Sequence, residues 1–500
     1  MKRIRSVAVV LSFLALAGCA VGPNYKRPLV AVPEHWTVEP ARGDSTATPA
    51  IEEWWTSFHD PELDSLVERA VHGNLDLKMA LERVQEARAS RGVSRSGFFP
   101  QTNADVSVEK LRGGFNQGVV RAVPSSNDSH GSASLLSPFE TSVYQGSLSS
   151  SWELDVFGGI RRGVEAATAD LAAQEENRCD VLVMLLGDVG RAYGELRGYQ
   201  RRMEIAEKNI RTQLDTLDLT TARAKAGLST DLDVSRAAAQ LDTTRAAVPP
   251  LISGIDASIH RLGVLLGDEP GALRSELEQA KPIPLAGRDV DVGLPTGLLE
   301  RRPDIRRAEA QVHAATARIR EAKADLFPKF VLSGTAGRQA SQLQELTLGL
   351  GNYFSVGPGI SLPLFNGGRI RANIAVQTSR ERQAVITYQS TILNALEEVE
   401  NALVNYAQEQ DRRDRLSQSV EQSQLAVDLS NAQYRGGQVD FLSVLEAQRD
   451  LFAAEDQLVQ SQASVTTDLI TLYRALGGGW NGGGYGAMSK GNGRNASDPF

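Results

Sequence analysis

The sequence predicts a mostly α-helical, internally duplicated chain with long coiled-coil helices and four transmembrane strands that belong to a β-barrel. Three observations predict this class. Blocks of the chain recur in the same order, two long stretches without proline have coiled-coil spacing, and four short runs alternate apolar and polar residues. Aromatic residues are only 6% of the 500, which suits long helices packed on one another.

The first eighteen residues have the three parts of a secretory signal, and Cys19 follows them. The apolar run at 7–16 is too short to remain as a membrane-spanning helix. The sequence LAGC at 16–19 resembles the lipobox of bacterial lipoproteins, which implies cleavage before Cys19 and acylation, for example by palmitate, of this cysteine. Ala20 rather than Asp comes next, which in such lipoproteins indicates the outer membrane. The alternative is a secreted chain in which Cys19 lies near a cleavage site by chance.

No catalytic or metal-binding pattern stands out in the sequence. The six histidines are scattered, neither H-E-x-x-H nor C-x-x-C occurs, and there is no G-x-S-x-G or Walker A motif. Cys179 has no partner for an intramolecular disulfide once Cys19 is acylated, and we expect it to be a small packed residue. The net charge of −8 argues against a nucleic-acid partner. We therefore expect no enzyme, and no cofactor besides the covalent lipid on Cys19.

The chain contains an internal duplication. The segment at 74–100 aligns without gaps with 302–328, including Phe-Pro at its end, and two further pairs of blocks follow in the same order. Each half reads as helix, strand, loop, strand, very long helix, glycine turn and helix. The predicted division is a signal peptide at 1–18, a lipid-anchored segment at 19–72, a first repeat at 73–266, a connector at 267–300, a second repeat at 301–476, and a Gly-rich, partly disordered tail at 477–500.

Each half contains one very long helix. No proline interrupts the chain between Phe157 and Gly227, or between Phe365 and Gly436. Such helices are about 100 Å long at 1.5 Å per residue. In the first of them, apolar residues at gaps of three, four or seven predict a coiled-coil seam that extends to Leu214 and Leu217.

Four runs alternate apolar and polar residues: 104–109, 144–156, 354–364 and a weaker one that opens at Phe330. In the second run, Leu148 and Leu154 lie on the apolar side, and Ser147 and Ser149 on the polar side. This pattern fits strands with lipid on one face and a lumen on the other, although a half-buried soluble sheet has the same period. We place the polar loop at 111–141 outside the cell.

Four strands cannot close around a water-filled lumen, and an open sheet edge in lipid leaves backbone groups unpaired. Strands in a membrane would therefore be pooled from several chains. Two chains give eight strands, which side chains nearly fill, and three give twelve, with room for a lumen. The residues favour an oligomer but do not by themselves fix three.

Five motifs carry a family resemblance: GCAVGPNYKRP (18–28), WWTSFHDPELDSLVERA (54–70), ERRPDIRRAEAQV (300–312), SLPLFNGGR (361–369) and LGGGW (476–480). They resemble the TolC-like outer-membrane factors, most closely the NodT-type efflux lipoproteins of RND pumps. The resemblance implies a homotrimer with one twelve-stranded outer-membrane barrel and a periplasmic α-barrel. It also implies a passive efflux conduit for small molecules, with a periplasmic adaptor and an inner-membrane RND-type pump as partners.

Two other functions remain open at this point. A type I protein-secretion duct has the same fold, although the lipobox and the VGPNYKRP start favour efflux. A lipid-anchored coiled-coil scaffold without a pore belongs to a different class, but it has no use for four alternating strands. The sequence does not name the exported substrate.

The two glycine turns are the first candidate site. Each ends a long helix at a glycine and restarts with a polar cap, which is ordinary helix-hairpin chemistry. The resemblance implies in addition that adaptors bind these tips. The residues concerned are Ala226, Gly227, Leu228, Ser229, Thr230, Gly436 and Gly437. The additional glycine of the second turn should loosen it.

A periplasmic gate is the second candidate site. Glu446 matches a position at which three chains of the family converge, where carboxylates would repel one another and attract cations. The alternative is a solvated helix face. By the same resemblance, Asp233 and Tyr434 match positions that link neighbouring hairpins when the mouth is closed.

Overall fold

The computed structural model describes residues 24–37, 51–113, 139–287, 290, 292–347 and 351–480. The signal segment, Cys19, most of the loop at 111–141 and the tail beyond Trp480 lie outside these residues. The chain divides into two compact units. Unit 1 is Met1–Lys26, Arg88–Ala169 and His313–Gln383, and unit 2 is Arg27–Ala87, Asp170–Val312 and Ala384–Phe500.

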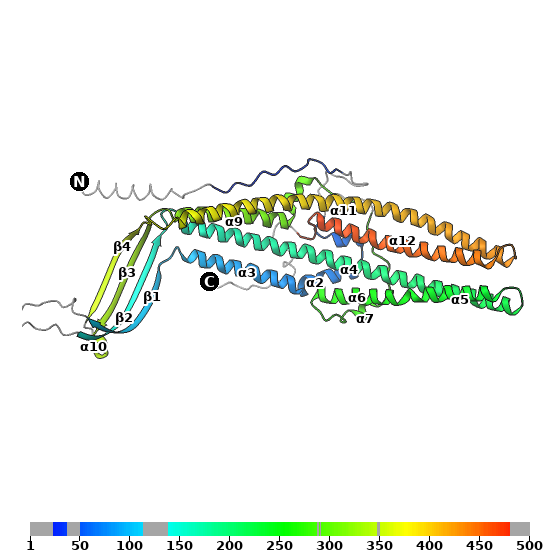
Figure 1. Ribbon diagram of the computed structural model, residues 1–500, viewed down its shortest axis with the longest axis horizontal. Coiled ribbons are helices and arrows are strands. Elements are labelled where there is room, and N and C mark those ends of the chain that lie inside the picture. Colours follow the sequence, from blue (N-terminus) through cyan, green and yellow to red (C-terminus); the bar gives the residue numbers. More distant parts are fainter. Residues whose placement is uncertain are drawn as a thin grey trace, which may run out of the picture. The chain divides into compact units, whose positions relative to one another are not determined.

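Unit 1 contains an antiparallel sheet with the strand order β1-β2-β3-β4 (Figure 1). The strands are β1 Gln101–Gly113, β2 Phe139–Leu154, β3 Lys329–Ala340 and β4 Asn352–Ser361. Each half of the chain supplies two of them, as predicted. The run that opens at Phe330 looked weak but is a full central strand. The predicted strand ends at Val156 and Leu364 are wrong: Asp155 turns away to cap a helix, and the ladder of β4 ends at Ser361.

The strand register puts most of the apolar positions on one face of the sheet, with exceptions such as Val143 and Val331 on the other. One row across the four strands contains Ala104, Leu148, Ala336 and Phe354, and the neighbouring row contains Asp105, Ser147, Gly337 and Tyr353. Since directly opposite residues of antiparallel strands point to the same face, the alternation in each strand becomes one apolar and one polar face. Val106, Leu148 and Phe354 are 83%, 57% and 82% exposed, so the described chain leaves this part of the apolar face uncovered.

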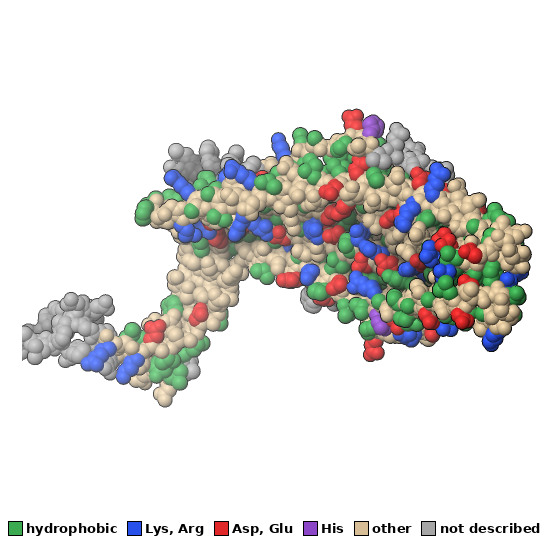
Figure 2. Space-filling model, turned by 45° about the vertical axis from the view of Figure 1, so that its right-hand side comes forward, with side chains coloured by type: hydrophobic (Ala, Val, Ile, Leu, Met, Phe, Trp, Pro, Cys, Tyr) green, Lys and Arg blue, Asp and Glu red, His purple; other side chains and the backbone are tan. Residues whose placement is uncertain are grey.

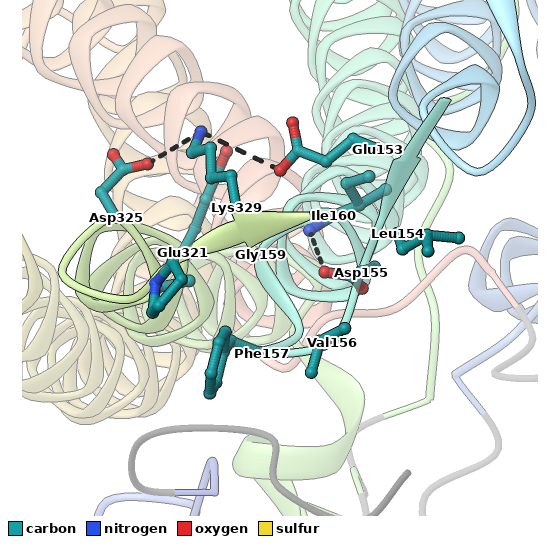
Figure 3. A pocket seen from close by; sticks show the side chains of 12 residues that line it. Glu153, Leu154, Asp155, Val156, Phe157, Gly159, Ile160, Glu321, Asp325 and Lys329 are labelled. Carbon is teal, nitrogen blue, oxygen red and sulfur yellow. Dashed lines mark hydrogen bonds and ion pairs between the residues drawn. The ribbon is translucent and has the colours of Figure 1, made fainter. Parts of the chain in front are cut away.

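The corner between β2 and the long helix α4 (Gly159–Lys225) is fixed by one carboxylate. Asp155 accepts hydrogen bonds from the backbone N–H groups of Ile160 (3.0 Å) and Arg161 (2.8 Å), and Gly158 takes a φ of 84° just before the helix. Figure 3 shows this corner, a cavity of about 210 Å³ in which Lys329 pairs with Asp325 at 3.2 Å. The cap satisfies two of the free N–H groups with which any helix begins.

The helices follow the predicted order in both halves. The first half has α2 (Pro61–Gly73), α3 (Leu75–Ser96), α4, α5 (Asp231–Ala246) and α6 (Val248–Leu266); the second has α9 (Pro303–Ala324), α11 (Arg369–Arg435) and α12 (Phe441–Ala475). Short helices are η1 (Trp54–Phe58), α7 (Arg274–Leu277), η2 (Pro295–Gly297), α8 (Leu298–Arg301) and α10 (Leu343–Thr347). Both long helices, α4 and α11, have 67 residues. No described helix is apolar over a length that would cross a membrane.

The two halves differ after the glycine turn. In the second half α12 is unbroken over 35 residues, whereas the first half divides into α5 and α6 at Ala247. Pro249 and Pro250 cause the division, because proline lacks an N–H and clashes with the preceding turn of a helix. The two halves therefore match in their long helices and strands but differ in the helices that follow the glycine turns.

Three of the sequence motifs meet in the core of unit 2. Trp54 is 2% exposed and stacks on Tyr473 with ring centroids 5.7 Å apart, and a Cβ added at Gly190 would approach the Trp54 ring to 2.8 Å. Trp480 donates from Nε1 to the carbonyl oxygen of Arg301 at 3.1 Å. Arg302 donates to the carbonyl oxygen of Ala475, the last residue of α12, at 2.8 Å. The WW, ERRPD and LGGGW motifs are thus parts of one packed junction.

A buried ion pair holds α2 against α4 in the same unit. Arg197 of α4 is fully buried and pairs with Glu62 of α2, while it also lies over the ring of Tyr193, 4.8 Å from its centroid. The Tyr193 hydroxyl donates to Asp60 at 2.6 Å, and Asp60 also caps α2. Removal of one partner would leave a buried charge uncompensated, which is strongly destabilising.

Candidate functional site

The two glycine turns have the same hydrogen bonds. Gly227 and Gly437 have φ values of 73° and 69°, and the residue after each donates to the carbonyl oxygen five positions back at 2.9 Å. This is the Schellman arrangement, which requires a left-handed residue and therefore favours glycine. Gly436 replaces Ala226 without changing any of these bonds, so the second turn is built like the first despite its additional glycine.

Each tip restarts with a side-chain cap. Thr230 and Asp233 form a capping box at the start of α5, and Asp440 accepts from the backbone N–H of Ser443 at the start of α12. Burial acts to raise the pKa of the Asp233 carboxyl, but hydrogen bonds from Thr230 and Ser229 hold it below its ordinary value. Within one chain, Asp233 therefore has a local structural role. Its predicted link to a neighbouring hairpin stays a prediction.

Tyr434 lies in an apolar cluster just behind the tips. It is buried with Phe441, Val444 and Ala237, and Arg223 of α4 lies over its ring at 4.6 Å. The structure thus brings Tyr434 together with a cation that sequence reasoning missed. It does not pair Tyr434 with Asp233. Glu446 is exposed on the first turns of α12, as both the gate hypothesis and the alternative of a solvated helix face require.

Toward the tips, the seam between α4 and α12 combines polar contacts, which were not predicted, with the predicted apolar residue Leu217, which packs against the cluster of Phe441 and Val444. Arg202 pairs with Asp456 at 2.7 Å, Asn209 donates to Glu455 at 3.2 Å, and Gln448 donates to Thr216 at 3.2 Å. The three α4 residues are seven apart, which is the coiled-coil spacing. Leu214, predicted in the seam, is instead 36% exposed, while Gln213 is buried. In the sequence, Arg202, Asn209 and Thr216 form a polar heptad beside the apolar one, and this spacing could have revealed the polar contacts.

The polar face of the sheet is the other candidate site, since it would face a lumen. In its lower rows, toward the helices of unit 1, most side chains are small. Toward the other end lie Gln145, Gln339 and Tyr353. Over the face of the molecule seen in Figure 2, charged side chains of both signs are mixed over the helices and are few along the strands.

Among the titratable groups of the helices, Cys179 and Asp468 have pKa values well above their ordinary values. Burial raises the pKa of the Cys179 thiol to about 11, so this cysteine stays protonated and unreactive. Burial, together with the nearby carboxylate of Glu409, raises the pKa of Asp468 to about 6. The described residues contain no group of three or more His, Cys, Asp or Glu side chains arranged to hold a metal.

Comparisons with known proteins agree on one kind of protein. A family model described as outer membrane efflux protein matches residues 66–267 and 294–478. Nodulation protein T of Rhizobium leguminosarum bv. trifolii is 32% identical over 468 residues, covering 94% of this chain and 96% of the relative. The toluene efflux pump outer membrane protein TtgI of Pseudomonas putida is 30% identical over 480 residues, with 94% and 98% covered. The solved outer-membrane channel OprN matches with a TM-score of 0.81 at 34% identity, over 92% of this chain and all of OprN.

We predict opposite effects of alanine at the two neighbouring glycines of the second tip. A Cβ at Gly436 would meet no atom closer than 3.5 Å, so Gly436→Ala should leave the tip as stable or more so. Gly437→Ala forces an L-residue into the left-handed region, at a cost of about 1–2 kcal/mol. Hydrogen exchange of the tip amides should therefore be faster in Gly437→Ala only, by roughly 5- to 30-fold. Equal exchange in both variants would contradict the turn geometry.

We also predict that Asp468→Asn stabilises the protein near neutral pH. A carboxyl whose pKa is raised on folding favours the folded state while it is protonated, and this contribution falls as pH rises from about 4 to about 6. At pH 7.5 the variant should gain on the order of 1 kcal/mol after allowance for solvent screening, and at pH 4 it should gain nothing. Thermal unfolding at both pH values measures this, with the exposed Asp450→Asn as the control. A gain of the same size at pH 4 would contradict the assigned cause.

Proposed function

Because this chain belongs to the outer membrane efflux protein family, we propose that it forms, as a trimer, the outer-membrane duct of a tripartite efflux pump. The chain is an outer-membrane efflux channel that extends into the periplasm, and it is not an enzyme. Its internally duplicated helices and strands are those of the solved channels. What remains a proposal is the number of chains, the partners and the gate.

The four-stranded sheet is the observation that carries the trimer. One face is apolar and exposed from Val106 on β1 to Ile360 on β4, and both β1 and β4 are unpaired edges within the described chain. In lipid each unpaired backbone group costs several kcal/mol, so β4 of one copy should pair with β1 of the next. Three copies give twelve strands, enough to enclose a lumen lined by the polar faces.

The helix tips are the proposed binding site for a periplasmic adaptor. Leu228 and Leu232 are 68% and 57% exposed beside the first turn, and a large apolar side chain held in solvent is a natural contact for a partner protein. The adaptor would connect the duct to an inner-membrane RND-type pump. The energy for transport would come from that pump.

A lipid on Cys19 would attach the N-terminus to the membrane, and the described residues begin five positions later, at Asn24. Asn24 bonds to Arg320 and Tyr25 stacks on His313 with centroids 4.4 Å apart, and both partners belong to α9, the helix that leads into β3. The residues between Cys19 and Asn24 span at most about 17 Å when extended. Acylation at Cys19 is therefore compatible with a membrane placed around the strands.

Small-molecule efflux is favoured over the two other functions. One relative is named as part of a toluene efflux pump, which supports a small solute rather than a secreted protein as cargo. A scaffold without a pore does not account for an apolar sheet face with polar residues opposite. The substrate of this chain is a separate question, because the relatives' names differ in this respect.

The test is channel formation by the purified protein in planar bilayers, with two neighbouring arginine variants. Leu148→Arg places a charge on the lipid face, at roughly 2–4 kcal/mol per copy, and should prevent heat-modifiable oligomers on a gel. Ser147→Arg faces the lumen and should assemble, with an altered conductance. Equal loss of assembly in both variants, or no conductance from the unmodified protein, would overturn the proposal.

A second experiment tests the gate. If three Glu446 carboxylates converge on the channel axis, Glu446→Gln should weaken both cation selectivity and block by divalent cations. Recordings belong at about 0.1 M salt, where the Debye length is about 10 Å, because 1 M salt would mask the effect. Glu421→Gln, at an exposed position of α11, is the control and should change neither property. Unchanged selectivity in Glu446→Gln would mean that this residue lies on a solvated face away from the axis.

A further inference from the structure

Side-chain size along the polar face of the sheet changes from one end to the other. In two rows toward the helices of unit 1, β2, β3 and β4 contribute only small residues, while β1 contributes Gln101 and Asn103; the small residues are Ser149, Ser151, Ser333, Thr335, Ser355 and Gly357. The next two rows toward the far end contain Tyr353, Gln145 and Gln339. Among these four rows Tyr353 is the one aromatic side chain, so a lumen lined by this face is narrowed at the level of this residue.

The Tyr353 phenol is held in place at that level. Gln145 of β2 donates from Nε2 to the Tyr353 hydroxyl of β4 at 2.7 Å, although β3 lies between these two strands. Gly337 of β3 makes this possible, because it is the residue directly opposite Tyr353 and has no side chain to interpose. A Cβ at Gly337 would come within 2.6 Å of the Gly146 carbonyl oxygen, so the position is restricted to glycine.

A hollow lies beside the phenol at the same end of the sheet. It has a volume of about 420 Å³ and is lined in part by Tyr353, Gln339 and Val143. This is within the range of sites that hold small molecules. A solute passing this level would meet an aromatic ring and an amide in succession, and no such pair lies in the rows of small residues.

We infer that Tyr353, oriented by Gln145, sets the size limit at the outer end of the conduit. The inference rests on the proposed function, since it needs three copies with their polar faces inward. Because each copy contributes β4 at the same height, three phenols and three amides stand in one ring. The hydrogen bond restricts the ring to one orientation, which gives a defined opening where a free tyrosine would give a variable one.

The experiment measures the outer opening separately from the periplasmic gate. Neutral polymers of graded size are added only on the barrel side of a planar bilayer, and the largest polymer that still lowers the single-channel conductance is recorded. Tyr353→Ala should shift this exclusion limit to larger polymers. The matched control is Ser355→Ala, two residues along the same strand on the same face, which should leave the limit unchanged.

Gln145→Ala provides a second variant in which the phenol remains. It should release the ring, so that current noise rises and the exclusion limit becomes less sharp. If Tyr353→Ala does not form oligomers on a gel, this variant alone decides the question. An unmodified protein without channels would refute the proposed function. Channels whose exclusion limit and noise are the same in the unmodified protein and in every assembled variant at these two positions would overturn this inference and leave the proposed function standing.

Discussion

The pairing of backbone groups at the sheet edges is the constraint on which the rest of the structure depends. A four-stranded sheet with an apolar face of Leu148, Phe354 and their neighbours is unsuited to water, and its open edges are unsuited to lipid. A single sheet is therefore stable neither in water nor in lipid. Pairing of β4 with β1 of another copy would resolve both difficulties, and it would make assembly a condition of membrane insertion.

The helices satisfy a different requirement, which is to keep α4 packed on α12 along the 35 residues of α12, about 50 Å. An apolar seam throughout would hold α4 and α12 firmly, but the contacts between them include the polar pairs Arg202–Asp456, Asn209–Glu455 and Thr216–Gln448. When the helices separate, the polar side chains of these contacts can bond to water instead, so the net cost in free energy is small. Exposing apolar side chains to water costs more. The firm part of unit 2 is instead the junction around Trp54 and Arg302, where segments from both ends of the chain meet.

Local pattern predicted much of this architecture. The alternation around Leu148 fixed which residues share a face, and the absence of proline after Phe157 predicted a helix that is indeed 67 residues long. The glycine turns were also visible, because the left-handed conformation at Gly227 has a residue preference of its own.

Features that depend on a partner distant in sequence were not predictable in the same way. Leu214 was placed in the seam by its spacing, but burial of Gln213 instead depends on where α12 packs. The contact between Gln145 and Tyr353 needs the strand order and a glycine on the strand between them. The cation over Tyr434 comes from Arg223, in the other half of the chain. Single-sequence patterns report the periodicity of an element and not its neighbour.

The two tips share one hydrogen-bond pattern but not one set of side chains. The first presents Leu228 and Ser229 after its glycine, and the second presents Gln438 and Val439. A trimer would thus display six loops of two alternating chemical types around its periplasmic end. A ligand that recognises only the backbone shape would have six pseudo-equivalent sites and could saturate at six copies per assembly. A ligand that recognises the side chains would have three equivalent sites and would saturate at three. The duplication therefore leaves the stoichiometry of the complex to the partner's mode of recognition.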